Sequence, residues 1–284
     1  MPERTANQSF DPQRYWEGRL SNQWTLGATG WLSLGESFNR WAYAVRAPVF
    51  RRLVRSELRD RPAQRVLDVG SGTGFYLRQW QRLGAQEVSG SDLTATAVER
   101  LRLAFPECHI QALDIGAPDL RLSAASFDAI SAIDMLYHIV DDAAYQRAFC
   151  NLAGLLAPGG VLIFSESFVP VRHPGEHQVS RTAAEIHDVL AQAGLTIVQQ
   201  RPVFVLMNTP SSSGSRLLHR WWDGLCRVVR RHEAAGWLAG AALAPIELGL
   251  TRVLRDGPST MLIAARLTEP DATPQRAQAT EGNR

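Results

Sequence analysis

The chain contains no lysine, so the 30 residues counted as Lys or Arg are all arginine. They stand against 28 acidic residues, and the formal net charge is only +2. A balance this even gives no overall positive field of the kind that attracts nucleic acid. We therefore expect no nucleic-acid partner, although single arginines can still bind carboxylates or phosphates.

Cysteine is scarce as well, with three residues at Cys108, Cys150 and Cys226. Their wide spacing fits neither a disulfide framework nor a metal-binding pair. No set of acidic residues stands out as an octahedral metal site, so we expect no metal. The cysteine usage suits a reducing compartment, and no signal-peptide pattern is present in the polar N-terminal stretch. We expect a cytoplasmic protein.

Long apolar runs are missing too. The closest approach to a membrane span is the segment 236–250, which Pro245 and Glu247 interrupt. This falls short of the roughly 20 apolar residues that a membrane-spanning helix needs, so we expect none. With 284 residues, 45% of them hydrophobic, the chain can bury a large core. One domain with additions is the simplest organisation.

What the chain does contain is a glycine-rich turn at 66–76, with the sequence Val-Leu-Asp-Val-Gly-Ser-Gly-Thr-Gly-Phe-Tyr. Its first four residues are typical of a buried parallel strand. The glycines allow a sharp turn, a close approach to a ligand and a helix that begins with free N–H groups. A dinucleotide fingerprint would place its third glycine one residue later, where Phe75 stands. The spacing indicates a different nucleotide cofactor, or a turn that binds nothing.

Acidic residues end three successive predicted strands. Asp68 ends the first, two residues before the glycines, and Asp114 stands at the end of the third, 109–115. Asp92 ends the second strand, about twenty residues after the turn, where a ribose-binding carboxylate is expected. The alternative for Asp92 is that it caps the helix predicted over 94–105.

The Asp-x-Gly-x-Gly-x-Gly pattern at 68–74, the acids at the strand ends and the Pro-Gly-Gly turn at 158–160 resemble class I S-adenosylmethionine (SAM) dependent methyltransferases of the small-molecule type. The resemblance covers residues 64–205. It implies an α/β fold, a seven-stranded, mostly parallel Rossmann-like sheet with helices on both faces. It also implies SAM as the cofactor. The residues that it assigns to cofactor binding are Asp68, Gly70, Ser71, Gly72, Gly74, Asp92, Leu93, Asp114, Ile115 and Ile133.

Helical additions are expected on either side of this core. The expected division is an N-terminal helical extension or lid at 1–60, the core at 61–207, a helical insert at 208–258, the last core strand at 259–267 and a disordered tail at 268–284. We expect residues 1–14 to be loose. Seven of the eight tryptophans lie ahead of the first strand or in the insert. The two additions are therefore expected to meet over the carboxyl edge of the sheet and enclose the acceptor; alternatively, these rings fill the core of a helical extension.

A candidate general base is His138, one helical turn past the fourth predicted strand, provided that the acceptor is a hydroxyl. The alternative is that it caps or braces the helix there. His177 and Glu166 are further candidates, together with His173. The residues predicted to meet the acceptor are Tyr43, Arg46, Tyr137, His173, Trp221 and Trp222.

The leading hypothesis is methyl transfer from SAM to a small organic acceptor, through oxygen, as in specialised-metabolite biosynthesis. One alternative is a lipid, prenyl or quinone-like acceptor, and another is a SAM-binding regulator or scaffold without catalysis. Arg227, Arg230, Arg231 and His232 could form a basic face for an anionic membrane or a phosphate-bearing substrate, although a solvated helix face is the favoured interpretation. The sequence predicts no particular oligomeric state.

Overall fold

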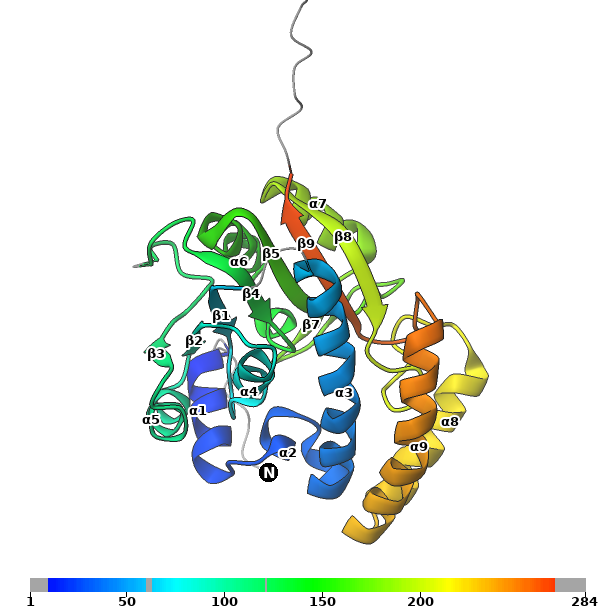
Figure 1. The fold of residues 1–284 in the computed structure, drawn as a ribbon. Helices are drawn as coiled ribbons and strands as arrows, with labels where there is room; N and C mark the ends of the chain where they lie inside the picture. The colour runs from blue at the N-terminus through cyan, green and yellow to red at the C-terminus, as the bar shows by residue number, and fades with distance from the viewer. Residues whose placement is uncertain (1–9, 60–62, 121, 269–284) are drawn as a thin grey trace, which may run out of the picture.

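A seven-stranded sheet forms the centre of the computed structural model, which describes residues 10–59, 63–120 and 122–268 (Figure 1). Its order is β3-β2-β1-β4-β5-β9-β8. The strands are β1 (Arg65–Val69), β2 (Glu87–Asp92), β3 (His109–Ala112), β4 (Phe127–Ala132), β5 (Leu156–Glu166), β8 (Leu195–Pro202) and β9 (Met261–Leu267). β9 is antiparallel to both of its neighbours, and the other neighbouring pairs are parallel. The predicted fold class is confirmed. Apart from Thr268, the predicted tail lies outside the described residues.

Helices cover both faces of the sheet, which explains why the central strands are almost continuously apolar. On one face pack α3 (Gly35–Leu58), α4 (Phe75–Arg82) and α5 (Ala95–Ala104). On the other face pack α6 (Asp142–Leu155) and α7 (Ala183–Gln192). A small two-stranded sheet, β6 (His173–Pro174) with β7 (Val179–Ser180), follows β5.

The chain ahead of α3 is helical from Pro12 onward. It forms α1 (Pro12–Asn22), α2 (Leu26–Thr29) and a 3₁₀ turn, η1 (Leu32–Leu34). Asp11 caps α1 by accepting a hydrogen bond from the Arg14 N–H at 3.0 Å, and Pro12 suits the first helical position. The expectation of loose structure is therefore wrong for 12–14, while 1–9 lie outside the described residues.

The predicted insert forms two helices, α8 (Arg216–Val229) and α9 (Glu233–Val253), and α9 packs along α3. Glu233 accepts hydrogen bonds from the first N–H groups of α3, Glu36 N at 2.9 Å and Ser37 N at 2.7 Å. The tryptophans of the two additions also meet, with 6.0 Å between the ring centres of Trp31 and Trp222. Two additions far apart in sequence thus pack against each other, as the sequence predicts.

By its length and composition, α9 could cross a membrane. A third of its most apolar 18-residue stretch is buried in the protein. The expectation that no segment reaches that length is thus wrong, because Pro245 and Glu247 do not interrupt the helix. Glu247 is fully buried, and its carboxylate accepts the backbone N–H groups of residues 205–207. Burial raises the pKa of Glu247, and these three donors oppose the rise. These hydrogen bonds join α9 to the chain that follows β8.

Candidate active site

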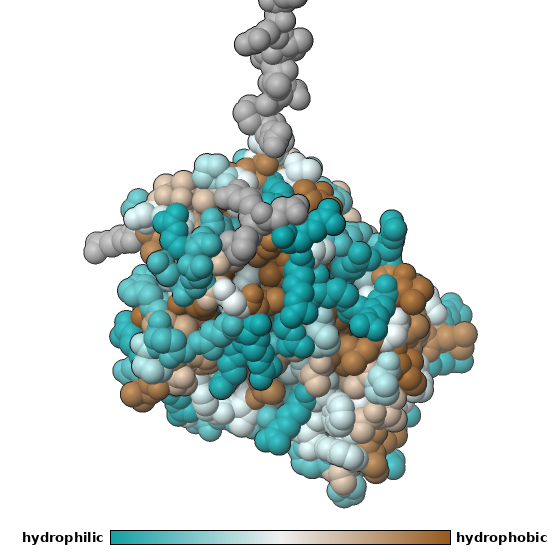
Figure 2. All heavy atoms as spheres, in the orientation of Figure 1, coloured by the Kyte–Doolittle hydropathy of each residue, from teal (hydrophilic) through white to brown (hydrophobic). Residues whose placement is uncertain are grey.

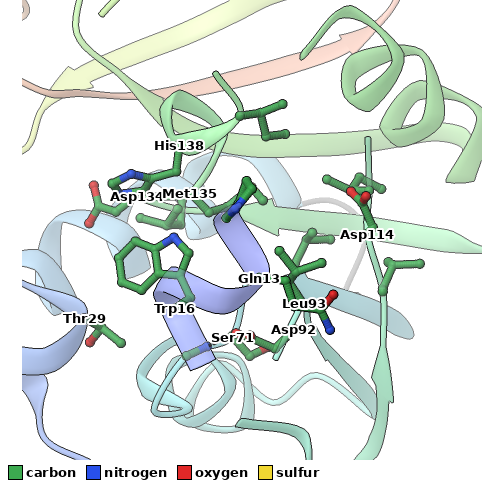
Figure 3. A pocket seen from close by; sticks show the side chains of 18 of the residues that line it. Gln13, Trp16, Thr29, Ser71, Asp92, Leu93, Asp114, Asp134, Met135 and His138 are labelled. Carbon is green, nitrogen blue, oxygen red and sulfur yellow. Dashed lines mark hydrogen bonds between the residues drawn. The ribbon is translucent and has the colours of Figure 1, made fainter. Parts of the chain in front are cut away.

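A cavity of about 430 Å³ opens at the carboxyl ends of β1 to β4 (Figure 3). The strand order reverses between β1 and β4, and ligands of open α/β sheets bind at such a switch point. The lining includes the glycine turn, the residues that follow β2, β3 and β4, and one side of α1. From the predicted cofactor set it contains Gly70, Ser71, Gly72, Asp92, Leu93, Asp114, Ile115 and Ile133.

The glycine turn has a backbone that only glycine adopts without strain. Gly70 has φ +70°, and a Cβ atom there would lie 2.9 Å from the Cβ of Met135. Gly72 has φ +51°, and its N–H donates to Asp92 Oδ2 at 2.9 Å. Gly74, with φ +79°, is not part of the lining. A Cβ there would meet the ring of Phe105, so Gly74 lets α4 pack closely on α5.

Asp68 lies just behind the lining, at the end of β1. Its Oδ1 accepts from Ser131 Oγ at 2.5 Å, while Oδ2 is enclosed and has no hydrogen-bond partner among the described residues. Burial raises the pKa of Asp68 to about 7, against the hydrogen bond from Ser131, which lowers it. An enclosed oxygen without a donor is costly. The residue therefore fits a ligand that brings a cationic or N–H group to this edge.

Asp92 and Asp114 both line the cavity. Asp92 is 7% exposed, and its Oδ1 accepts from the Thr94 backbone N–H at 3.0 Å and from Thr94 Oγ1 at 2.8 Å. The alternative that Asp92 caps α5 is wrong, because the cap is Thr94, whose hydroxyl accepts from the Ala97 N–H. Asp114 is exposed at the opposite side and accepts from the Gly116 N–H at 2.9 Å. Carboxylates at these two positions can receive the hydroxyl and amino groups of a nucleoside.

Asp134, which follows β4, pairs with a buried arginine. Its side chain lines the cavity and forms an ion pair with Arg46, and the two side chains are only 11% and 8% exposed. Asp134 has φ +56°, and Ser165 Oγ accepts its N–H at 2.7 Å. Arg46 itself does not line the cavity. Its charge is taken up by Asp134, while Tyr43 from the same helix does reach the lining.

His138 lies on the 3₁₀ turn η2 (Leu136–His138) and lines the cavity. Its Nδ1 lies 2.8 Å from the carbonyl oxygen of His177. A carbonyl can only accept, so Nδ1 must donate, and Nε2 then carries a lone pair. Burial lowers the pKa of His138 to about 4. The ring packs edge-on against Trp16 of α1, 4.8 Å away, and is neutral at neutral pH.

Several predicted residues lie outside the cavity. Tyr137 packs on the ring of His138, with 4.5 Å between ring centres. His173 is exposed on β6, and His177 contributes its carbonyl to His138. Glu166 is buried and accepts from the Tyr145 hydroxyl at 2.9 Å, and burial raises its pKa to about 7. Trp221 and Trp222 belong to α8, and the insert supplies none of the described residues that line the cavity.

The cover of the cavity includes α1, which belongs to the N-terminal extension predicted as a lid, although its first residues, 12–14, were expected to be loose. Figure 3 shows Gln13 and Trp16 on this helix, beside the cavity, with His138 and Asp134 near Trp16. The signal was present, since Asp11 followed by Pro12 is a typical helix start. No signal marked Asp134, because neither its backbone conformation nor its partner 88 positions away can be seen in the sequence. Within the described part of the chain, no three His, Cys, Asp or Glu side chains are placed to hold a metal ion.

The sheet order, the glycine turn and the acids at the strand ends together define a class I SAM-dependent methyltransferase domain. Residues 66–160 match a family model described as a methyltransferase domain. The predicted resemblance of this segment to class I SAM-dependent methyltransferases is thereby confirmed.

Curated relatives share part of this segment. The ubiquinone biosynthesis O-methyltransferase of Xanthomonas campestris pv. campestris (strain B100) is 41% identical over 108 residues, which are 37% of this chain and 43% of the relative. That of Albidiferax ferrireducens is 38% identical over 106 residues, 36% of this chain and 40% of the relative. The chain thus matches less than half the length of these relatives.

Solved structures extend the likeness in fold. The N-methyltransferase NodS of Bradyrhizobium japonicum WM9, solved with S-adenosyl-L-homocysteine, has a TM-score of 0.54 at 16% identity, over 91% of this chain and 99% of that one. The 1,6-didemethyltoxoflavin-N1-methyltransferase of Burkholderia thailandensis has a TM-score of 0.51 at 19% identity, over 80% and 79%. At these identities the likeness shows the fold alone.

Proposed function

We propose that the protein binds SAM in the 430 Å³ cavity and transfers its methyl group to an oxygen of a small organic acceptor. The observation that carries the proposal is the meeting of the glycine turn, Asp92 and a neutral His138 around one cavity. The O-methyltransferase names of the curated relatives support oxygen as the acceptor atom.

The residues present fit SAM. The enclosed, unpartnered Oδ2 of Asp68 and the positive-φ glycines suit its methionine end. Asp92 suits the ribose, and Asp114 with the Ile115 backbone suits the adenine. SAM supplies an electrophilic methyl group on a sulfonium sulfur, so the protein has mainly to hold and align the acceptor and keep water away. Trp16 and the rest of α1 cover the cavity for that purpose.

The acceptor is proposed to be a hydroxyl on an aromatic or quinone-like ring. Trp16, Tyr43 and Phe75 give the cavity flat apolar walls, with Trp16 against His138 and Phe75 against Tyr43. Such walls favour a planar ring, because aromatic groups stack at ring-centre distances of about 4.5–7 Å. The ubiquinone-biosynthesis names of the relatives favour the same class. Incubation with methyl-labelled SAM and a series of phenols and hydroquinones, followed by mass analysis, tests this assignment.

His138 is proposed to remove the acceptor proton through Nε2. With the pKa of His138 lowered to about 4, the base is unprotonated throughout neutral pH. We therefore expect protonation of His138 to leave kcat for a phenol unchanged from pH 8 down to about 5. A histidine with the ordinary pKa of about 6.5 would instead lower kcat near that pH. Steady-state kinetics across that range measure the profile.

Replacing His138 by Gln separates catalysis from bracing. The Gln amide can still donate to the His177 carbonyl but cannot act as a base. We expect His138→Gln to unfold at nearly the wild-type temperature and to lose about 100-fold or more in kcat. His138→Ala should lower both the unfolding temperature and kcat. A Gln variant with wild-type kcat would show that His138 only braces the turn.

Asp68 should make cofactor binding pH-dependent. The pKa of Asp68 is about 7 in the free protein, above its ordinary 3.8. This residue therefore lowers the free energy of unfolding as the pH rises from 3.8 to about 7. A cationic group bound nearby favours the ionised form, and SAM should therefore bind about tenfold more tightly at pH 8 than at pH 6. Titration calorimetry at both values measures this. The variant Asp68→Asn should bind SAM weakly and with the same affinity at both pH values. If its affinity for SAM changed with pH as much as that of the wild type, another group would be responsible for the pH dependence.

A SAM-binding regulator is the alternative outcome of these measurements. Calorimetric binding of SAM without turnover of any phenol, hydroquinone, amine or lipid acceptor would favour a non-catalytic role. Failure of the folded protein to bind SAM at all would overturn both functions.

A further inference from the structure

The solvent side of α9 is an apolar stripe. Leu238, Ala242, Ile246, Gly249 and Val253 are all exposed and recur every three or four residues, so they lie along one side of the helix. Leu238 is 63% exposed and Val253 79%. Figure 2 shows apolar side chains gathered on the side of the molecule that α8 and α9 form. Contiguous exposed apolar surface of this kind commonly marks a site of interaction.

Acidic groups are kept off this stripe. α9 has two acidic residues, Glu233 and Glu247. Glu233 is engaged by the first N–H groups of α3, and Glu247 is fully buried against the backbone after β8. The charge that borders the stripe is therefore positive. On the neighbouring α8 and the two residues after it, five arginines stand against one acid, Asp223.

A second group of arginines borders the other side of α9. A cleft of about 350 Å³ between α3 and α9 is lined by Arg51, Arg52, Arg55 and Arg252, with Pro48 and Leu248. No carboxylate is among these lining residues, and Arg52 Nη1 is enclosed without a hydrogen-bond partner among the described residues. Burial and then the neighbouring Arg252 and Arg201 lower the pKa of Arg52. Grouped guanidinium groups without a counter-ion are suited to a phosphate.

We propose that α9 docks on an anionic phospholipid membrane, with its apolar stripe in the headgroup region and the arginines of the α3–α9 cleft on lipid phosphates. An apolar stripe with basic flanks is how an interfacial helix binds, with its apolar side entering the boundary between headgroups and acyl chains. Trp237, 53% exposed and near the start of α9, packs on Trp41 of α3 and lies on the same side of α9 as Leu248 of the cleft, where an amphipathic ring suits the interface. On this proposal α9 lies in the plane of the interface and holds the enzyme beside the membrane.

Vesicle sedimentation of the full chain tests the surface. We expect the protein to bind vesicles that contain phosphatidylglycerol, to bind poorly to pure phosphatidylcholine, and to be released by salt. Leu238→Glu with Val253→Glu, which places charge in the stripe, should weaken binding by at least about tenfold. Arg52→Gln with Arg252→Gln, which empties the cleft of two charges, should weaken it by about tenfold or more and reduce the salt dependence.

Matched controls use sites on the sheet domain. Leu103→Glu changes a leucine that is 84% exposed on α5, and Arg65→Gln changes an exposed arginine at the start of β1. Both should bind vesicles like the wild type. SAM affinity, measured without vesicles, should be unchanged in every variant, so failure of the membrane proposal and failure of the methyltransferase proposal give different results.

Three results would overturn the proposal. The first is equal binding to neutral and anionic vesicles, or none to either. The second is a rise in unfolding temperature with inorganic phosphate that Arg52→Gln removes, without vesicle binding, since the cleft would then bind a soluble anion. The third is loss of a dimer in Leu238→Glu by light scattering, without vesicle binding, since the stripe would then meet a second copy of the chain.

Discussion

Replacement of Gly70 by alanine is expected to weaken SAM binding by about 10- to 100-fold, or 1.4–2.8 kcal/mol. Gly70 has φ +70°, and its new Cβ would lie 2.9 Å from the Cβ of Met135, which also lines the cavity. One of the two cavity walls has to move, and the N–H groups of the turn move with it. Titration calorimetry with SAM measures the loss.

The matched control is Gly84→Ala. Gly84 follows α4 with φ +80°, so alanine there suffers the same backbone strain of about 1–2 kcal/mol. A Cβ at Gly84 would meet no atom within 4 Å, and the residue is not part of the cavity. We expect both variants to lose stability and only Gly70→Ala to lose affinity. Equal affinity in the two would place the cofactor elsewhere.

Replacement of Arg46 by methionine is expected to destabilise the fold by about 3–5 kcal/mol, because it leaves Asp134 charged in a nearly closed site. In a chain of this size the unfolding midpoint should fall by roughly 6–20 °C. Arg46→Met with Asp134→Asn removes the unpaired charge while keeping a residue type that tolerates positive φ, and should recover a large part of the loss. Differential scanning calorimetry measures the unfolding midpoints of the wild type, Arg46→Met and the double variant.

An exposed ion pair is the control for this prediction. Arg172 pairs with Asp142 and Glu185, and these three side chains are 35%, 59% and 34% exposed. Arg172→Met should cost less than about 1 kcal/mol. If Arg46→Met were no more harmful, Arg46 and Asp134 would not depend on each other, and Arg46 would be free to meet the acceptor as the sequence analysis predicted.

The cofactor side of the site could be read from the sequence because its signals are local. A glycine at positive φ and an acid at a strand end are each visible within a few residues. The parallel sheet then brings Asp92 and Asp114 to one edge without further information. The predicted Gly74 shows the limit of this reasoning, since its place in the motif did not reveal that it faces Phe105 and not the cavity.

The acceptor side could not be read in the same way. It depends on contacts between distant segments, such as Arg46 with Asp134 and Trp16 with His138. Tryptophan content predicted that the two additions meet and that both enclose the acceptor, but none of the described residues of the insert lines the cavity. Trp222 packs on Trp31 and leaves the cover to α1. Burial of large rings is non-directional, so composition alone does not select the partner.

α3 is a single helix of 24 residues, long enough to reach from one functional surface to the other. Its first N–H groups are held by Glu233 of α9, Tyr43 stands in the cavity wall, and Arg52 stands in the cleft beside α9. A closely packed helix moves as a rigid unit, because its neighbours leave no space for it to deform locally. Tyr43 in the cavity wall and Arg52 in the cleft therefore stand on one helix, so we expect a displacement of α9 to reach the wall that Tyr43 presents.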